Sequence, residues 1–499
     1  MGGCVTSCEM RSESRRDLLR LGALGAISAV VPACADALGD DGSASGDKLK
    51  GGGRAGSGGK SGASGQARGG ASGAGSKGGR AGAGGKKAYG GKSGASGAAG
   101  AAGAPVNQPG FPSVGPCATS LAPLPELGSL IACPLLPDPF RRFDGSRVTT
   151  QAEWACRRAE LRGLAEKYVY GVKPPKPSSV TAVPNGNKLV ITCTEGSQSI
   201  TFSVTVSKPS SATGPAPAII GLSGSSLGGV PSGIGSITFD NSALGQQANL
   251  ASRNKGLFFD LYGTDVAGTS ACMAWAWGVS RIIDALEQVD MGINPARLGV
   301  TGCSRNGKGA LVAGVWDDRI ALVLPEESGS GGVNAWRVAE QENVEQAENG
   351  GVQTASEIVG ENVWLATAFE AFAQGDLTKL PLDQHSVIAI RAPLPLLIIE
   401  NSSQLWLGPK SCYAGGRAAA QVWSALGRPD SMGFSQFGDG GHCAFQTQNS
   451  GPHVTAFCRR FLLDDESANT AAVGVCSDDK NDATLGYETW VDWDTPVLG

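Results

Sequence analysis

This chain has few histidines and no cysteine motif of the kind that binds zinc. The 499 residues include three histidines, none of the 13 cysteines stands in a CxxC pair, and no cysteine–histidine cluster has the spacing of a zinc site. That pattern excludes the zinc-finger and zinc-ribbon classes. The apolar run from Leu21 to Val31 is too short to cross a bilayer as a helix. The 75 glycines do not recur at every third position, which excludes a collagen-like fold.

The first part of the chain, residues 1–38, has the features of an export signal. The motif SRRDLL (14–19) has the twin-arginine form and precedes the apolar run. That run ends in VPAC (31–34), which is similar to a bacterial lipobox with Cys34 as the lipidated residue. We therefore expect a protein that is exported from a bacterial cell and is either secreted or anchored at the cell envelope through Cys34.

The second part, residues 39–112, is a predicted disordered linker. Positions 42–104 are almost only Gly, Ala, Ser, Lys and Arg, so this segment cannot bury an apolar core. Ten basic residues and no acidic residue lie between Lys48 and Lys92. A contact with acidic polysaccharide or membrane phosphate is one interpretation, and a merely solvated linker is the one we favour. Residues 113–499 have the composition of a single catalytic domain.

Short apolar runs alternate with amphipathic runs along this third part. Six of them are typical of buried strands that end in loops, at 216–222, 256–263, 297–302, 319–328, 394–402 and 432–442. Residues 278–289 place five apolar side chains on one helix face, those of Val279, Ile282, Ile283, Leu286 and Val289. Strands separated by helices predict a mostly parallel sheet, whose ligand site lies at the carboxyl ends of the strands.

The segment LGVTGCSRNGKGALVAGVW (298–316) places Ser304 between a predicted strand and a predicted helix. A nucleophile elbow needs small residues around its serine because the turn is tight. Gly302 and Gly307 meet that need, whereas Asn306 stands where the G-x-S-x-G pattern has its second glycine. The alternative interpretation is a serine that caps the helix.

A serine nucleophile needs a base, and the three histidines leave few candidates. His385 precedes an apolar run, so it is expected at the wrong end of a strand, and His453 lies at a helix start and is interpreted as structural. His442 follows the last predicted strand in the loop FGDGGHCAF (437–445). We predict His442 as the base, and the chain order of serine before histidine fits an α/β-hydrolase.

Three carboxylates compete as the acid that orients the base. Glu400 lies near the end of the strand that precedes the base strand, whereas Glu326 and Glu327 follow the strand after the elbow helix. The residue pattern alone leaves these three alternatives open.

Two cysteines flank the predicted nucleophile and base. Cys303 directly precedes Ser304, and Cys443 directly follows His442. If the serine and the histidine meet, their neighbours come close, so we predict a disulfide that ties the two loops together. The alternative is a pair of buried free thiols.

Five motifs are held in common with one known family: GCSRNGKGA (302–310), ESGSGG (327–332), EIVGENVW (357–364), ENSSQLWLGP (400–409) and GHCAF (441–445). Over about residues 130–499 the chain resembles the glucuronoyl esterases, carbohydrate esterase family 15. The resemblance implies an α/β-hydrolase fold, a three-layer α/β/α sandwich with a mostly parallel central sheet. It also implies hydrolysis of esters between 4-O-methyl-glucuronic acid of glucuronoxylan and lignin alcohols, without a metal or an organic cofactor.

The same resemblance assigns roles to individual residues. It implies Ser304 as nucleophile, His442 as base and Glu327 as acid. Some bacterial members carry the acid on a loop that here reads NSS (401–403), which favours Glu327 over Glu400. Arg305 is similar to the oxyanion-hole arginine of the family. The positions that bind the glucuronate correspond to Lys308, Gln353, Glu361 and Trp406.

The resemblance also bears on the cysteines. The family's disulfide between elbow and histidine loop is matched by Cys303 and Cys443, whereas a further bridge of fungal relatives would need cysteines near Ala335 and Gly415, which are absent. Two other disulfides are expected. One joins Cys117 to Cys156, with Cys133 as an alternative partner in that bridge, and the other joins Cys458 to Cys476.

The predicted partners follow from the predicted activity. We expect a monomer that acts on glucuronoxylan and lignin–carbohydrate esters and does not bind nucleic acid. One alternative is an esterase of another carbohydrate ester, such as acetylated xylan. The other is a non-catalytic surface protein that binds carbohydrate.

Overall fold

A ten-stranded sheet organises the part of the chain that the computed structural model describes, residues 117–118, 121–438, 440–445, 447–478 and 482–499. Its strands are β1 Ser179–Asn185, β2 Lys188–Glu195, β3 Gln198–Ser207, β4 Ala216–Leu222, β5 Gly235–Phe239, β6 Ile293–Cys303, β7 Leu322–Glu326, β8 Leu396–Glu400, β9 Met432–Gln436 and β10 Val475–Ser477. The predicted export signal, with Cys34, and the predicted linker lie outside the described residues. Among the described helices, none combines the length and the apolar character needed to span a bilayer.

The strand order is β1-β2-β3-β5-β4-β6-β7-β8-β9-β10. The pairs from β1 to β5 at one edge are antiparallel, and every pair from β5 to β10 is parallel. The predicted mostly parallel sheet is therefore confirmed. Parallel strands bring their carboxyl ends to the same edge, so the loops after β4, β6, β7, β8 and β9 lie close to one another.

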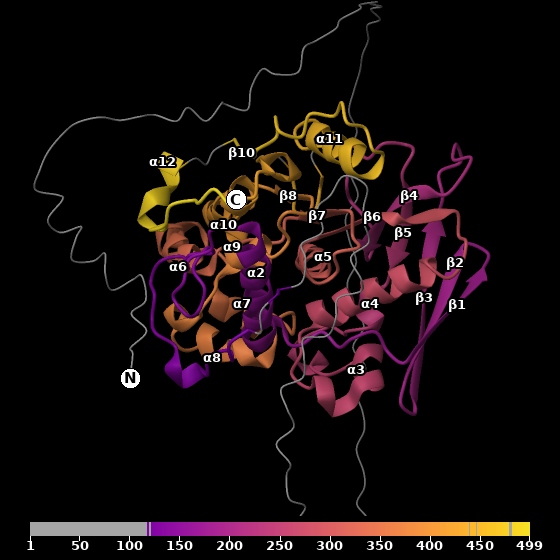
Figure 1. Ribbon diagram of the computed structural model, residues 1–499, viewed down its shortest axis with the longest axis horizontal. Coiled ribbons are helices and arrows are strands. Elements are labelled where there is room, and N and C mark those ends of the chain that lie inside the picture. The colour runs from indigo at the N-terminus through magenta and orange to yellow at the C-terminus, as the bar shows by residue number, and fades with distance from the viewer. Residues whose placement is uncertain (1–116, 119–120, 439, 446, 479–481) are drawn as a thin grey trace, which may run out of the picture. The chain divides into compact units, whose positions relative to one another are not determined.

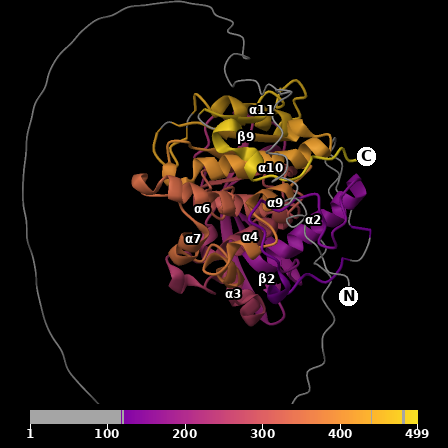
Figure 2. The same ribbon diagram turned by 90° about the vertical axis from the view of Figure 1, so that its left-hand side faces the viewer.

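Helices cover both faces of the parallel strands (Figures 1 and 2). They are α2 Gln151–Ala165, α3 Leu257–Tyr262, α4 Ala271–Leu286, α5 Arg305–Trp316, α6 Trp336–Glu345, α7 Ala355–Glu361, α8 Glu370–Ala373, α9 Gln384–Ala389, α10 Pro409–Ala425, α11 Gly451–Leu462 and α12 Asp482–Leu485. Leu322 and Leu324 of β7 pack in one apolar cluster with Phe457 of α11, whereas Val323 points into the other cluster, which includes α4 and α5. This alternation confirms the three-layer sandwich.

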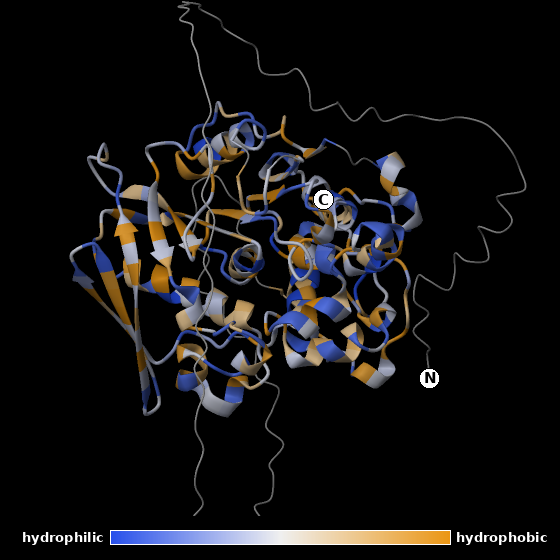
Figure 3. Ribbon diagram, turned by 180° about the vertical axis from the view of Figure 1, so that it is seen from behind, coloured by the Kyte–Doolittle hydropathy of each residue, from blue (hydrophilic) through white to orange (hydrophobic). Residues whose placement is uncertain are grey.

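Most of the predicted elements are confirmed, and two regions differ. The predicted strand at 256–263 is wrong, because Leu257–Tyr262 form helix α3 between Gly256 and Gly263. A short apolar run has no periodicity that separates a buried strand from a buried helix. The antiparallel hairpins β1–β3 were not predicted; their alternating hydrophobic and hydrophilic residues (Figure 3) are buried mainly on one face.

Of the other two expected disulfides, one is present and one is not. Cys117 and Cys156 form a disulfide. The expected bridge between Cys458 and Cys476 is wrong, because Cys458 is a buried cysteine outside any disulfide. Cys458 instead belongs to the apolar cluster of α11, where a thiol packs as a small apolar side chain.

The contact between α5 and β7 gives a test of the packing. A Cβ atom built at Gly314 of α5 would lie 2.2 Å from Cγ2 of Val323, so no larger residue fits without displacement. We expect Gly314→Ala to lower the free energy of unfolding by about 1–3 kcal/mol, measured by urea denaturation.

Gly360 of α7 is the matched control. A Cβ atom there meets nothing within 4 Å, so Gly360→Ala should raise stability by about 0.5–1 kcal/mol through helix propensity. Equal stability of Gly314→Ala and the wild type would contradict the packing described for α5.

Candidate active site

Ser304 occupies the sharp turn between β6 and α5. Its φ is 60°, a conformation that is uncommon for a residue with a side chain, and its amide donates to the Glu326 carbonyl oxygen at 2.9 Å. A Cβ atom at Gly302 would lie 2.6 Å from the Asn306 carbonyl oxygen, and one at Gly307 would lie 2.4 Å from the Glu326 carbonyl oxygen. The turn therefore requires both glycines. Ser304 stands at the N-cap position of α5, but its side chain makes no capping hydrogen bond, so capping is not the role of its hydroxyl.

Asn306, which departs from the usual serine motif, has a structural partner. Its Oδ1 accepts a hydrogen bond from Asn241 Nδ2 at 3.0 Å, and Asn241 Oδ1 in turn accepts from Ser223 Oγ at 2.9 Å. The asparagine thus ties the nucleophile turn to the segments that follow β4 and β5. No sequence motif marks Asn241, because its two partners, Ser223 and Asn306, lie in other parts of the chain.

His442 is held by a carboxylate. Its Nδ1 lies 2.6 Å from Glu327 Oε2, and the same oxygen accepts from the Cys443 amide at 3.0 Å. Glu327 is buried, whereas the His442 side chain is partly exposed. An acid on Nδ1 leaves Nε2 available for the nucleophile and stabilises the protonated ring.

The other two carboxylates have different partners. Glu400 Oε1 accepts from the Ser328 amide at 2.9 Å and from Ser328 Oγ at 3.0 Å, and burial raises the pKa of Glu400 to about 8. Glu326 contacts the hydroxyls of Ser226 and Thr301. Of the three candidates, Glu327 is the one that contacts the histidine.

The remaining histidines are structural. His385 lies in α9, not beside a strand as the sequence suggested, and its Nε2 contacts the Pro137 carbonyl oxygen at 2.8 Å. Burial lowers its pKa to about 4. His453, near the start of α11, contacts Ser435 Oγ at 2.9 Å through Nδ1.

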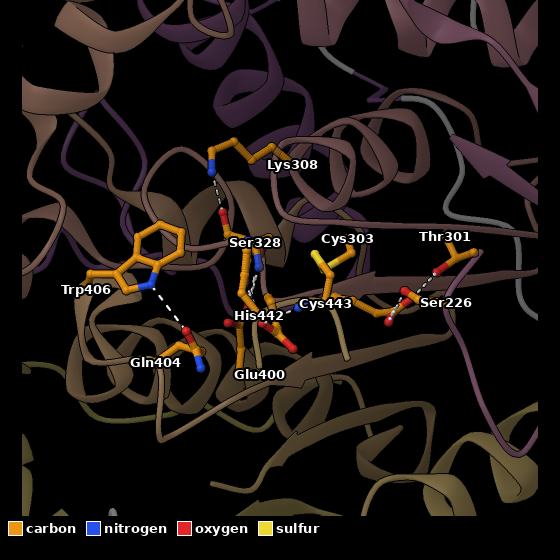
Figure 4. The surroundings of a disulfide bond; sticks show 12 residues. Ser226, Thr301, Cys303, Lys308, Ser328, Glu400, Gln404, Trp406, His442 and Cys443 are labelled. Atoms are coloured by element: carbon orange, nitrogen blue, oxygen red, sulfur yellow. Dashed lines mark hydrogen bonds and ion pairs between the residues drawn. A yellow bond between two sulfur atoms is a disulfide. The ribbon is translucent and has the colours of Figure 1, made fainter. Parts of the chain in front are cut away.

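Cys303 and Cys443 form a disulfide with a Cα–Cα distance of 5.8 Å (Figure 4). It links the end of β6 to the loop after β9, across 140 residues of sequence. The two sulfurs and a His442 ring nitrogen lie within 4.8 Å of one another. Because the sulfurs are bonded to each other, neither is a thiolate that would ligate a metal ion.

Backbone strain gathers around these residues. Among the described residues, six that are not glycine have a positive φ, and four of them lie in the loops after β4, β6, β7 and β9: Ser223, Ser304, Glu327 and Cys443. Such conformations cost of order 1–3 kcal/mol each and cluster at functional sites. The four residues border the carboxyl edge of the sheet, where the predicted site lies.

The predicted sugar-binding residues form a second group beside the histidine. The Gln353 amide donates to the Trp406 carbonyl oxygen at 2.8 Å, and the Gln353 side chain donates to the Glu361 carboxylate. The half-exposed Trp406 ring meets His442 edge-on, with centroids 4.9 Å apart.

Lys308 lies buried below the surface of the site. Its Nζ donates to the Ser328 carbonyl oxygen at 2.7 Å and lies 5.5 Å from the centre of the Trp364 ring. Burial lowers its pKa to about 8. Arg305, the first residue of α5, is exposed beside Ser304.

Two residues that the sequence did not reveal hold the histidine loop. Gln404 Nε2 donates to the Gly440 carbonyl oxygen at 3.1 Å, and Gln404 Oε1 accepts from Trp406 Nε1 at 3.3 Å. Asp478 accepts from the Gly438 amide at 2.6 Å and from Ser402 Oγ at 2.7 Å. No local motif marks either residue, because their partners lie on other loops.

Comparison with known proteins gives consistent matches. A family model described as fungal glucuronyl esterase matches residues 191–427. The 4-O-methyl-glucuronoyl methylesterase of Hypocrea jecorina is 45% identical over 364 residues, which are 73% of this chain and 76% of the relative. The solved glucuronoyl esterase catalytic domain from Hypocrea jecorina is 44% identical, with a TM-score of 0.69, covering 74% of this chain and 99% of that one.

A second solved structure carries a ligand. It is a glucuronoyl esterase mutant from Sporotrichum thermophile in complex with methyl 4-O-methyl-beta-D-glucopyranuronate. It is 38% identical, with a TM-score of 0.68, and the match covers 74% of this chain and 97% of that one.

The expected bacterial origin and localisation are wrong. Curated relatives at 43–45% identity come from fungi, among them Hypocrea jecorina, Schizophyllum commune and Cerrena unicolor. That origin conflicts with a bacterial export signal and a lipid anchor at Cys34.

The disulfide between Cys303 and Cys443 should dominate the stability of the site. Replacing both residues by alanine should lower the free energy of unfolding by roughly 4–5 kcal/mol, because the bridge closes a long loop. Removing the Cys117–Cys156 bridge, with a sequence separation of 39, is the matched control and should cost roughly 4 kcal/mol. Free alkylation of Cys303 and Cys443 in native, unreduced protein, read by peptide mapping, would show that the bridge does not form.

Proposed function

The chain belongs to the glucuronoyl esterase family, whose members are carboxylic ester hydrolases, and we propose that it hydrolyses esters of 4-O-methyl-glucuronic acid through an acyl-enzyme on Ser304. The observation that carries this proposal is the Glu327–His442 hydrogen bond beside a disulfide that joins the histidine loop to the serine turn.

The proposed mechanism assigns one step to each group. His442 Nε2 takes the Ser304 proton as Oγ attacks the ester carbonyl, and Glu327 stabilises the imidazolium that forms. Arg305 and the amides at the start of α5 stabilise the tetrahedral oxyanion. The alcohol leaves with the proton from His442, and water then hydrolyses the acyl-enzyme by the same route.

The uronate ring is proposed to bind between Lys308 and Trp406. Buried Gln353 Oε1 accepts no hydrogen bond from any described residue, and a sugar hydroxyl that reached it would give it a donor. The carboxylate of Glu361 offers a further acceptor, and the half-exposed ring of Trp406 offers an apolar face to the sugar. The relative solved with methyl 4-O-methyl-beta-D-glucopyranuronate supports this class of ligand.

The proposed natural substrate is the ester that joins glucuronoxylan to lignin alcohols, and the enzyme is proposed to act as a monomer. The open position of Trp406 at the surface supports access by a bulky ester. Hydrolysis of benzyl glucuronate, compared with deacetylation of acetylated xylan, separates this proposal from the acetyl-esterase alternative. Activity on acetylated xylan alone would overturn it.

Ser304→Ala should abolish hydrolysis of benzyl glucuronate, with a loss on the order of 10⁴-fold or more in kcat, because the nucleophile is missing. The fold should be retained, since the change removes one oxygen from a partly exposed side chain. Circular dichroism checks the fold. A variant that keeps more than a few per cent of wild-type kcat would remove Ser304 from the mechanism.

Glu327→Gln should lower kcat by about 10³–10⁴-fold, because the histidine loses the charge that stabilises its cation. Glu400→Gln is the matched control: its carboxyl is also buried but contacts Ser328, so we expect less than a tenfold loss. A larger loss in Glu400→Gln than in Glu327→Gln would show that the acid is assigned to the wrong residue.

A further inference from the structure

Glu326 is a buried carboxyl at the end of β7 that the proposed mechanism does not use. It is 2% exposed, and its Oε2 accepts from Ser226 Oγ at 2.9 Å. Its Oε1 lies 3.2 Å from Thr301 Oγ1. Figure 4 shows Ser226 and Thr301 on the far side of the disulfide from Trp406.

The hydrogen count at Thr301 favours the neutral form of this carboxyl. A threonine hydroxyl carries one hydrogen, and Thr301 Oγ1 has a shorter contact, 2.7 Å, with the Leu324 carbonyl oxygen. Thr301 Oγ1 is thus placed to donate both to Leu324 and to Glu326 Oε1, and its one hydrogen serves the shorter contact best. A hydrogen on Glu326 Oε1 lets both contacts be hydrogen bonds at once. The neutral acid therefore completes a chain from Ser226 through Glu326 and Thr301 to Leu324.

Ser226 belongs to the loop that follows β4, residues 223–234. Strand β4 is the sheet neighbour of β6, which ends at the nucleophile. In α/β-hydrolases the equivalent loop supplies one amide of the oxyanion hole. The same loop contacts helix α11, which follows the His442 loop in the chain: Thr455 Oγ1 donates to the Gly229 carbonyl oxygen at 2.6 Å.

We propose that Glu326 is a positioning residue that acts as a neutral carboxylic acid, joining Ser226 of the oxyanion-hole loop to Thr301 of β6, and that its ionisation slows turnover. The proposal rests on the proposed function of Ser304. Loss of the Glu326 proton to solvent leaves the single Thr301 hydrogen to be shared between Glu326 Oε1 and the Leu324 carbonyl oxygen. It also places a buried negative charge beneath the site where the oxyanion forms, which opposes the transition state.

No cation compensates such a charge among the described residues. The side chain of Glu326 meets the Thr301 hydroxyl from β6 and the Ser226 hydroxyl from the loop after β4. Helix α5 approaches the Glu326 backbone carbonyl with Gly307, which has no side chain. The charge that acts on Glu326 is the like charge of Glu327. Burial, with a smaller effect of Glu327, raises the pKa of Glu326 to about 7, so the ionisation falls in an accessible pH range.

The test is the pH profile of kcat for benzyl glucuronate hydrolysis from about pH 5 to pH 9, with the uncatalysed rate subtracted. Wild-type kcat should fall several-fold above about pH 7. Glu326→Gln retains both hydrogen bonds without an ionisable proton, so its profile should not fall. Ser226→Ala should lower kcat and move the fall to higher pH, because the serine hydroxyl stabilises the ionised form.

Glu340→Gln is the matched control. The pKa of Glu340 is also raised, mainly by its partial burial, but Glu340 lies in α6 with an exposed side chain. It should keep the wild-type profile. A fall of kcat that persists in Glu326→Gln, or a wild-type profile without a fall, overturns the proposal.

Thermal unfolding separates this proposal from the proposed function. A raised pKa in the folded state means that stability falls as pH rises from the ordinary carboxyl range to about 7. The unfolding temperature of the wild type should therefore fall over that range relative to Glu326→Gln, and equal shifts would overturn the neutral acid. Absence of any uronate-ester hydrolysis in the wild type would instead overturn the proposed function.

Discussion

One oxygen atom, Oε2 of Glu327, receives hydrogen bonds from both His442 Nδ1 and the Cys443 amide. It therefore fixes the ring and the backbone of the histidine loop at the same time. The loop itself is short of regular structure and rich in glycine, so it has little intrinsic order. The site depends on this contact, because a histidine that rotates freely does not align with a nucleophile.

The other restraints on the loop act around that contact. The Cys303–Cys443 disulfide joins it to the serine turn, Gln404 holds it from the Trp406 side, and Asp478 holds it from β10. These restraints come from three separate parts of the sequence. Their common effect is to hold the His442 loop next to the Ser304 turn.

Three glutamates at the ends of β7 and β8 have different hydrogen-bond partners. Burial raises the pKa of Glu326 and of Glu400, and each is hydrogen-bonded to a serine or threonine. Glu327 is the one of the three that contacts the histidine. The negative charge of Glu327 adds to the raised pKa of both Glu326 and Glu400, which opposes ionisation of all three carboxyls together.

The sequence by itself determined the strand–turn–helix around Ser304, the choice of His442 and the pairing of Cys303 with Cys443, because each rests on local chemistry or on a short list of residues. It did not separate Glu326, Glu327 and Glu400 without the family resemblance, and it misassigned Leu257–Tyr262 as a strand. Only the tertiary structure decided those points and revealed Gln404, Asp478 and Asn241. The physical reason is that hydrogen-bond partners and burial depend on which loops meet at the sheet edge, and that meeting leaves no periodic or local pattern in the chain.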